Sequence, residues 1–346
     1  MEEITNTNNA LLEIEDLHIH FVSKVETVKA INGLNLVVHK GKTLGLVGET
    51  GAGKTTTALA ILNMIAKPQG RIVAGRITLD GEDIFSKTED QMEGIRGNTV
   101  SMIFQDPMTS LNPVMTVGDQ IAEVLQIHKK LSKAAAAKEA QKMLETVGIP
   151  GARSVEYPHQ FSGGMKQRVL IALGLACTPK LLIADEPTTA LDVTIQAQVL
   201  ELMKDLKDQM NMSMLMITHD LGIVAEVCDE VAVMYAGAIV ESGTLEDIFD
   251  RKRHPYTEGL FNSLPDVNNR TQSLKPIGGQ MPNPADLPQG CSFHPRCEYA
   301  MPKCSQEEPP MHRFSETHCA KCWLYENTDQ CMLASQDYVP SQGVSE

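Results

Sequence analysis

The sequence lacks any long apolar run. No stretch of its 346 residues approaches the roughly 20 apolar residues that a membrane-spanning helix needs. The opening residues MEEITNTNNALLEIEDLH have neither the basic start nor the apolar centre of a secretory signal. We therefore expect a cytosolic chain that reaches a membrane only through partner proteins.

Basic residues are also scarce relative to acidic ones. The chain has 30 Lys and Arg against 44 Asp and Glu, a formal net charge of −14. Proteins that bind nucleic acid usually carry a basic surface. The charge balance therefore disfavours nonspecific binding to nucleic acid.

Cysteine is nearly absent before residue 291, where only Cys177 and Cys228 occur. Both stand among apolar residues, which indicates small buried thiols. The other six cysteines lie between Cys291 and Cys331. Because a cytosol is reducing, disulfides are the least favoured explanation of this concentration.

The first informative motif is GETGAGKTT, residues 48–56, which fits the P-loop pattern G-x-x-x-x-G-K-[ST]. The apolar stretch 42–48 before it is typical of a buried parallel strand, and KTTTALAILNMI after it has helical spacing. A glycine-rich loop between strand and helix turns its N–H groups toward phosphate oxygens. The predicted nucleotide contacts are Gly48, Glu49, Thr50, Gly51, Ala52, Gly53, Lys54, Thr55 and Thr56.

A second motif is PKLLIADEPTTALD, residues 179–192. Leu181 to Ala184 predict a central strand that ends in Asp185 and Glu186, at the sheet edge where open α/β sheets bind ligands. A carboxylate there can hold Mg²⁺ through water, and the next can orient the water that attacks the γ-phosphorus. The alternative is a solvated acidic pair in a turn.

A third motif is QFSGGMKQRVLIALGLA, residues 160–176. Ser162, Gly163 and Gly164 precede a run with helical apolar spacing, so a second helix N-terminus is expected there. It could be an ordinary N-cap, but two such helix ends in one chain suggest that both contact nucleotide.

The rest of the chain predicts a layered α/β fold. Short alternating runs from Leu11 to about Gly97 predict an antiparallel layer, and strands alternate with helices again from Lys180 to Gly243. Between Asp106 and Cys177 the pattern is helical, including one helix with Ser132 as N-cap and Gly148 as its stop.

Taken in order, these motifs resemble the ATP-binding subunit of an ABC transporter of the peptide/nickel importer family, close to dipeptide and oligopeptide permeases. The resemblance spans about residues 11–325. It adds FQDP with Gln105, the D-loop ALD ending at Asp192, and THD with His219. One departure is the signature FSGGM, with Phe161 and Met165 where LSGGQ is commoner.

The resemblance implies roles for single residues. Lys54 would contact the β- and γ-phosphates, and Glu186 would be the catalytic base or water positioner. His219 would contact the γ-phosphate. Phe21 would stack on adenine, or else be only a core aromatic. The remaining ligands would be Thr55, Gln105 and Asp185 for Mg²⁺, and Ser162, Gly163, Gly164 and Asp192 for the nucleotide of a partner subunit.

The resemblance also implies an organisation and partners. Residues 1–250 would form the ABC nucleotide-binding domain, with an antiparallel β layer, a mixed central sheet and a helical subdomain at about 106–178. A C-terminal extension at 251–326 and a disordered tail at 327–346 would follow. The chain would lie at the cytoplasmic face of the plasma membrane, paired with a related ATP-binding subunit or with itself, on two transmembrane permease subunits served by an extracellular substrate-binding protein.

The function implied is an ATP-hydrolysing motor for uptake of dipeptides or oligopeptides. The segment RHPYTEGLFNSLP, residues 253–265, resembles one that distinguishes peptide-importer ATPases. Nickel chelates and glutathione remain open as cargo. A soluble ABC ATPase acting on nucleic acid or ribosomes is the alternative, which the charge disfavours.

The clustered cysteines predict a metal centre in the extension. Cys291, Cys297 and Cys304 are separated by five and six residues, and Cys319 and Cys322 form a C-x₂-C pair. The wide spacing favours a [4Fe–4S] cluster, zinc is second and free thiols are third. The resemblance makes Cys322 the fourth ligand, with Cys319 as an alternate.

Overall fold

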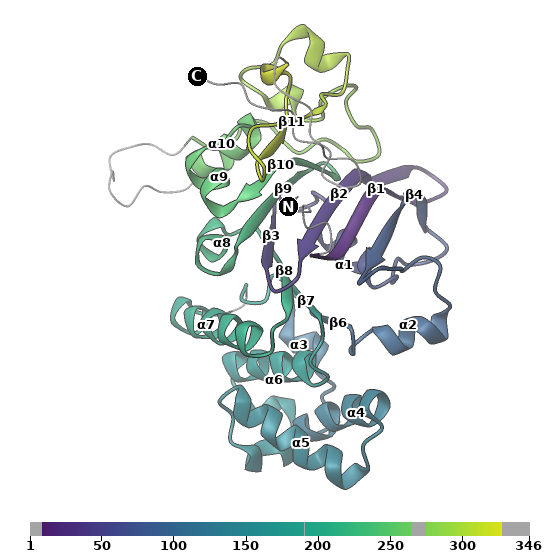
Figure 1. Ribbon diagram of the computed structural model, residues 1–346, viewed down its shortest axis with the longest axis vertical. Helices are drawn as coiled ribbons and strands as arrows, with labels where there is room; N and C mark the ends of the chain where they lie inside the picture. The colour runs from purple at the N-terminus through teal and green to yellow at the C-terminus, as the bar shows by residue number, and fades with distance from the viewer. Residues whose placement is uncertain (1–8, 190, 264–274, 327–346) are drawn as a thin grey trace, which may run out of the picture.

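The computed structural model describes residues 9–189, 191–263 and 275–326. It contains a four-stranded sheet in the order β2-β1-β4-β5 and an eight-stranded sheet in the order β11-β12-β10-β9-β3-β8-β7-β6. A group of helices lies at one end of the molecule, and the C-terminal extension lies at the other (Figure 1). The tail predicted to be disordered, 327–346, is outside the described residues.

The four-stranded sheet is the antiparallel layer expected from the first hundred residues. Its alternating apolar residues, such as Leu12, Ile14 and Ile19, are fully buried. The sequence did not predict a helix here, yet Thr88 and Gln91 form a capping box that starts one. The elements are β1 (Ala10–Val22), β2 (Thr27–His39), β4 (Gly70–Leu79), β5 (Glu82–Asp83) and α2 (Glu89–Ile95).

The eight-stranded sheet is mixed, as the sequence predicted. Its parallel part is β6 (Val100–Ile103), β7 (Leu181–Asp185), β8 (Ser213–Thr218), β3 (Thr43–Val47) and β9 (Glu230–Tyr235). β10 (Ala238–Thr244) runs antiparallel to β9. Every residue of β3, β7 and β8 is buried, which is why these strands are apolar runs rather than alternating patterns.

Some helices cover the sheet, and others lie between residues 106 and 177, the stretch that was predicted to be helical. There, Ser132 accepts a hydrogen bond from the Ala135 N–H at 3.3 Å, and Gly148 has φ of 77° after the helix, as expected. The helical part holds α3 (Pro107–Ser110), α4 (Val117–Lys129), α5 (Lys133–Thr146) and α6 (Gly163–Leu175), and the other helices are α1 (Lys54–Ile61), α7 (Val193–Gln209), α8 (Leu221–Val227), α9 (Leu245–Asp250) and α10 (Pro255–Asn262). Cys177 and Cys228 are buried, as predicted.

The C-terminal extension continues the central sheet. Strand β12 (Cys319–Lys321) pairs antiparallel with β10, and β11 (Met311–Arg313) pairs with β12. Three single helical turns, at His294–Arg296, Pro302–Ser305 and Trp323–Tyr325, complete it. The edge of β10 is therefore covered by later residues of the same chain.

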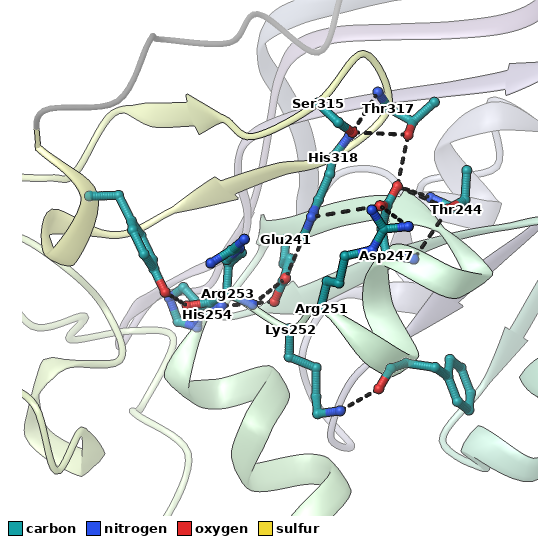
Figure 2. A network of polar contacts seen from close by, with 12 residues as sticks. Glu241, Thr244, Asp247, Arg251, Lys252, Arg253, His254, Ser315, Thr317 and His318 are labelled. Carbon is teal, nitrogen blue, oxygen red and sulfur yellow. Dashed lines mark hydrogen bonds and ion pairs between the residues drawn. The ribbon is translucent and has the colours of Figure 1, made fainter. Parts of the chain in front are cut away.

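A fully buried carboxylate joins β10 to the extension (Figure 2). Glu241 accepts hydrogen bonds from the backbone N–H groups of Arg253 and His254, at 2.7 and 2.9 Å. The His318 Nε2 atom lies 2.8 Å from Glu241 Oε1, the oxygen that also accepts from Arg253, and His318 is also buried. A buried carboxyl group is tolerated when its oxygens are hydrogen-bonded, and the three partners occupy both oxygens.

A second buried carboxylate supports the same junction (Figure 2). Asp247 at the start of α9 accepts hydrogen bonds from the hydroxyls of Thr244 and Thr317, at 2.9 and 2.7 Å. These contacts lower its pKa, although burial alone would raise it. The carboxylate therefore ties α9 to the loop that precedes β12.

His254 should make the fold sensitive to acid. Burial lowers its pKa to about 4, and Lys321 adds to the effect while Glu241 opposes it. Since an unfolded histidine has a pKa of about 6.5, the unfolded chain takes up a proton below that pH and the folded chain does not. The free energy of unfolding should therefore fall by about 1 kcal/mol between pH 7.5 and 5.5 from this group.

Urea titrations at the two pH values measure this loss. The matched variant His254→Asn keeps a side-chain acceptor for the Tyr256 N–H, which His254 now caps at 3.0 Å, but does not titrate. It should lose correspondingly less stability on acidification. Equal losses in the variant and the original chain would assign the acid sensitivity to other groups.

Candidate functional site

The P-loop connects β3 to α1, as the sequence predicted. A Cβ atom at Gly48 would lie 2.2 Å from the Met234 carbonyl oxygen, so no other residue fits there without a shift. Gly53 takes a φ of 110° as the N-cap of α1. The loop therefore leads directly into a helix N-terminus, where free N–H groups and the helix dipole favour an anion.

Lys54 and Thr55 connect the loop to its surroundings. The Lys54 ammonium, 7 % exposed, donates to the carbonyl oxygens of Gly48 and Glu49 at 2.7 and 3.0 Å. Burial lowers its pKa. The Thr55 hydroxyl donates to Asp185 Oδ2 at 2.8 Å, so the first and second motifs meet across 130 residues of sequence.

Asp185 ends strand β7 and is buried. Burial raises the pKa of its carboxyl group, and the neighbouring Glu186 raises it further, while Thr55 acts in the opposite direction. A carboxylate that is costly to ionise alone gains most from a cation placed beside it. Its oxygen chemistry and the Thr55 hydroxyl fit Mg²⁺.

Glu186 is the centre of the polar contacts at this edge of the sheet. Its carboxylate accepts hydrogen bonds from Gln105 Nε2 at 2.8 Å and the Thr189 hydroxyl at 3.0 Å, and His219 Nδ1 lies 2.9 Å away. Burial would raise its pKa, but His219, Thr189 and Lys54 outweigh burial and the net pKa is lowered. The carboxylate is therefore ionised at neutral pH and able to accept a proton.

Gln105, Glu186 and His219 come from the loops that follow β6, β7 and β8. The structure thus brings together three residues that the sequence could associate only through family resemblance. Glu186 also has φ of 47°, a backbone conformation that is rare outside glycine and asparagine and is often found at functional sites. Thr189 belongs to the same motif as Glu186 but was not among the predicted site residues.

The signature residues lie at the N-terminus of α6 and are far from the P-loop in the sequence. Ser162 caps this helix by accepting from the Met165 N–H at 3.4 Å, and Ser162 and Gly163 are exposed. A Cβ atom at Gly164 would lie 2.5 Å from Ile195 of α7, so the glycine allows close packing of the two helices. Asp192 caps α7 by accepting from the Ile195 N–H at 3.0 Å.

The two residues that depart from the commoner signature contact the same arginine. The Arg153 guanidinium lies 4.4 Å from the ring centroid of Phe161, which is buried. Its Nη1 atom is 3.4 Å from the Met165 sulfur. Phe161 and Met165 therefore form one packed unit with Arg153, which pairs with Glu156 in turn.

Phe21 lies in β1 opposite Gly70 of β4 and is half-buried. It packs against the core beneath the antiparallel sheet. Adenine stacking by this ring stays a prediction. In the loop that follows α3, Leu111 belongs to the core at 4 % exposure and Val114 is 79 % exposed.

Four cysteines of the extension lie near one another as free thiols: Cys291, Cys297, Cys304 and Cys322. Burial raises the pKa of Cys322 to about 12, and the other three sulfurs add to this rise. Cys319 is disulfide-bonded, so disulfides, least favoured from the sequence, do occur here and its sulfur is already engaged. Within ranges 9–189, 191–263 and 275–326, no group of three or more His, Cys, Asp or Glu side chains is arranged to hold a metal ion.

None of the helices in the described part of the chain is both long and apolar enough to span a bilayer. Residues 31–189 match the family described as ABC transporter, and residues 240–304 match the family described as oligopeptide/dipeptide transporter, C-terminal region.

The chain is similar to two Bacillus subtilis proteins over nearly its whole length. It is 50 % identical to the oligopeptide transport ATP-binding protein AppD, covering 92 % of this chain and 98 % of that protein. It is 47 % identical to the dipeptide transport ATP-binding protein DppD, covering 94 % and 98 %.

Among solved structures, the dimeric ATP-binding cassette MJ0796 bound to ADP and Pi aligns with a TM-score of 0.61 at 23 % identity, over 68 % of this chain and 98 % of that one. CbiO1 from Clostridium perfringens aligns with a TM-score of 0.60 at 26 % identity, over 71 % and 92 %. Both likenesses agree with the ABC ATPase fold. The chain therefore belongs to the ABC-type ATPases, in the family of oligopeptide and dipeptide transport ATP-binding proteins.

Proposed function

We propose that the chain is the ATP-hydrolysing motor subunit of an ABC importer, which couples ATP binding and hydrolysis to the uptake of dipeptides or oligopeptides. The contacts that converge on Glu186, beside a P-loop already joined to Asp185, carry the proposal. The relatives are named for oligopeptide and dipeptide transport, and this supports peptides as the cargo.

The chemistry assigned to the site follows from its hydrogen bonds. The P-loop N–H groups and Lys54 hold the β- and γ-phosphates, so Lys54 exchanges the Gly48 and Glu49 carbonyls for phosphate oxygens. Thr55, Gln105 and Asp185 would hold Mg²⁺, and the ion would neutralise charge that develops on the phosphates. Glu186 accepts the proton of the attacking water, and His219 contacts the γ-phosphate.

A second subunit completes the site in this proposal. Ser162 and Gly163 are exposed at the start of α6, so their donors are open to a nucleotide held by another chain. Closure of two subunits on ATP and their release after hydrolysis give the two states that a motor needs. We propose a related, nonidentical subunit as the partner, with Asp192 at the interface.

The remaining partners follow from the transporter assignment. Two transmembrane permease subunits contact the helical subdomain, residues 106–178, and an extracellular substrate-binding protein delivers the cargo to them. The chain is then a peripheral protein of the cytoplasmic face of the plasma membrane. Residues 1–250 act as the nucleotide-binding domain and residues 251–326 as the importer-specific extension.

We further propose a [4Fe–4S] cluster in the extension, bound by Cys291, Cys297, Cys304 and Cys322. Burial is the main cause that raises the pKa of Cys291, Cys297 and Cys322, and the neighbouring sulfurs add to it. Thiolates gathered so closely would repel one another, and a metal centre would offset that repulsion. A bound cluster would link three loops of an extension with few regular elements. Zinc is the alternative.

Affinity capture tests the importer assignment. The tagged chain, purified from detergent-solubilised membranes, should bring down a second ABC ATPase and two multi-span membrane proteins in similar amounts. Mass spectrometry identifies them, and an untagged strain is the control. Recovery with ribosomal proteins or nucleic acid, and without membrane proteins, would support the soluble ATPase instead.

Glu186→Gln tests the catalytic assignment. The amide cannot accept the proton, so steady-state ATP turnover should fall by about 100-fold or more while ATP affinity is kept. Glu230→Gln is the matched control. Glu230 is the first residue of β9, and its carboxylate pairs with His39 rather than with a residue of the nucleotide site. Near-normal turnover of Glu186→Gln would remove this residue from catalysis. Lys54→Ala should instead lose nucleotide affinity.

Metal analysis of anaerobically purified protein tests the cysteine centre. About four irons and matching sulfide per chain are expected, together with broad visible absorbance. Cys322→Ser should lose the iron, whereas Cys319→Ser should keep it. One zinc and no iron would replace the cluster with a zinc site.

A further inference from the structure

The extension contacts the P-loop residue Glu49. The Glu49 N–H donates to the Tyr256 hydroxyl oxygen at 2.9 Å. Its two carboxylate oxygens accept from Nη1 and Nη2 of Arg296, at 3.0 and 3.2 Å, in a bidentate pair. Tyr256 and Arg296 follow Glu49 by 207 and 247 residues, so neither contact is local.

Both partners of Glu49 are rigidly held. Tyr256 is fully buried and packs edge-on to Tyr235 at 4.6 Å between ring centroids, and Phe293 contacts both rings. The Arg296 side chain is 5 % exposed, and its Nε atom donates to the Gly278 carbonyl at 2.9 Å. Residues this well packed have little freedom to reorient, so they fix the atoms that they bind.

These contacts restrain Glu49 within the loop. The Glu49 carbonyl accepts from the Ala52 N–H at 3.2 Å, while its N–H and its carboxylate are bound by the extension. One residue of the loop is thus fixed at its donor, its acceptor and its side chain. The orientation of the neighbouring peptide groups, which must present N–H groups to phosphate, depends on that restraint.

We infer that Tyr256 and Arg296 are positioning residues of the nucleotide site, which preorganise the P-loop through Glu49. The inference rests on the proposed role of the P-loop in binding ATP, and it makes the importer-specific extension part of that site. Preorganisation lowers the conformational cost of binding, so losing it weakens nucleotide affinity more than it slows turnover at saturation.

Tyr256→Phe is the first test, because it removes only the oxygen that accepts from Glu49. The matched control is Tyr325→Phe, in the same extension, whose hydroxyl donates to the Arg253 carbonyl at 3.1 Å. Equilibrium titration with ATP and Mg²⁺ should show about a 5- to 10-fold higher Kd for Tyr256→Phe, and an unchanged Kd for the control. The turnover number at saturating ATP should stay within about twofold of the original chain.

A double-mutant cycle tests whether Arg296 acts through Glu49. Glu49→Gln and Arg296→Gln should each raise the Kd for ATP, and the double variant should be no weaker than the worse single variant. Arg296→Lys, which keeps the charge without the bidentate geometry, should recover part of the affinity. Fully additive effects would mean that Arg296 does not act through Glu49, and would overturn the inference.

The outcomes separate the inference from the function on which it rests. Failure of the original chain to bind ATP would overturn both. Binding by the original chain with the same Kd in Tyr256→Phe, Arg296→Gln and Tyr325→Phe would overturn the inference alone. Thermal unfolding of each variant identifies any that lose affinity because they unfold. Tyr256→Phe, the most conservative change, then decides whether the inference stands.

Discussion

The parallel register of three buried strands is the constraint on which the site depends. β8 lies between β3 and β7, with Thr218 beside Val47 and Ile217 beside Asp185. The P-loop, the two carboxylates and His219 all start where these strands end, so they share one edge of the sheet. The strands are held there by burial on both faces, which leaves no freedom for a slipped register.

At that edge of the sheet, burial and neighbouring charges have opposite effects on the pKa values of the ionisable groups. Lys54 and Asp185 are both buried. Burial lowers the pKa of Lys54 and raises the pKa of Asp185, so it favours the neutral form of each group. The charge of each residue opposes the pKa shift of the other, and Lys54 also helps to lower the pKa of Glu186. The charges of Lys54, Asp185 and Glu186 thus act on one another. A polyanion and its cation can bind among these groups without leaving an unpaired buried charge.

The sequence predicted those parts of the fold and the site that are coded locally. The P-loop, the strand before Asp185 and the caps at Ser132 and Ser162 all follow from residues within a few positions of one another. Helix α2 was missed because its capping box lies between strand-like runs and its helix buries only Met92. Locally coded features are those that periodicity and capping rules can detect.

Long-range contacts could not be predicted in the same way. Nothing near Tyr256 or Arg296 indicates that their partner is Glu49, since that contact exists only after the aromatic rings of β9, α10 and the Cys291 loop have packed. The three-residue strand β12 also has no pattern of its own, because the exposed edge of β10 defines it.

The buried Glu241 limits how the extension can be removed from the cassette or exchanged between related proteins. Its carboxylate is satisfied by two backbone groups at 253–254 and by His318, all of which lie after the nucleotide motifs in the chain. A cassette cut before these residues would keep every phosphate-binding motif and still carry an unpaired charge beneath an open sheet edge. The extension and β10 thus form one structural unit, so an exchange of extensions between related chains should include β10.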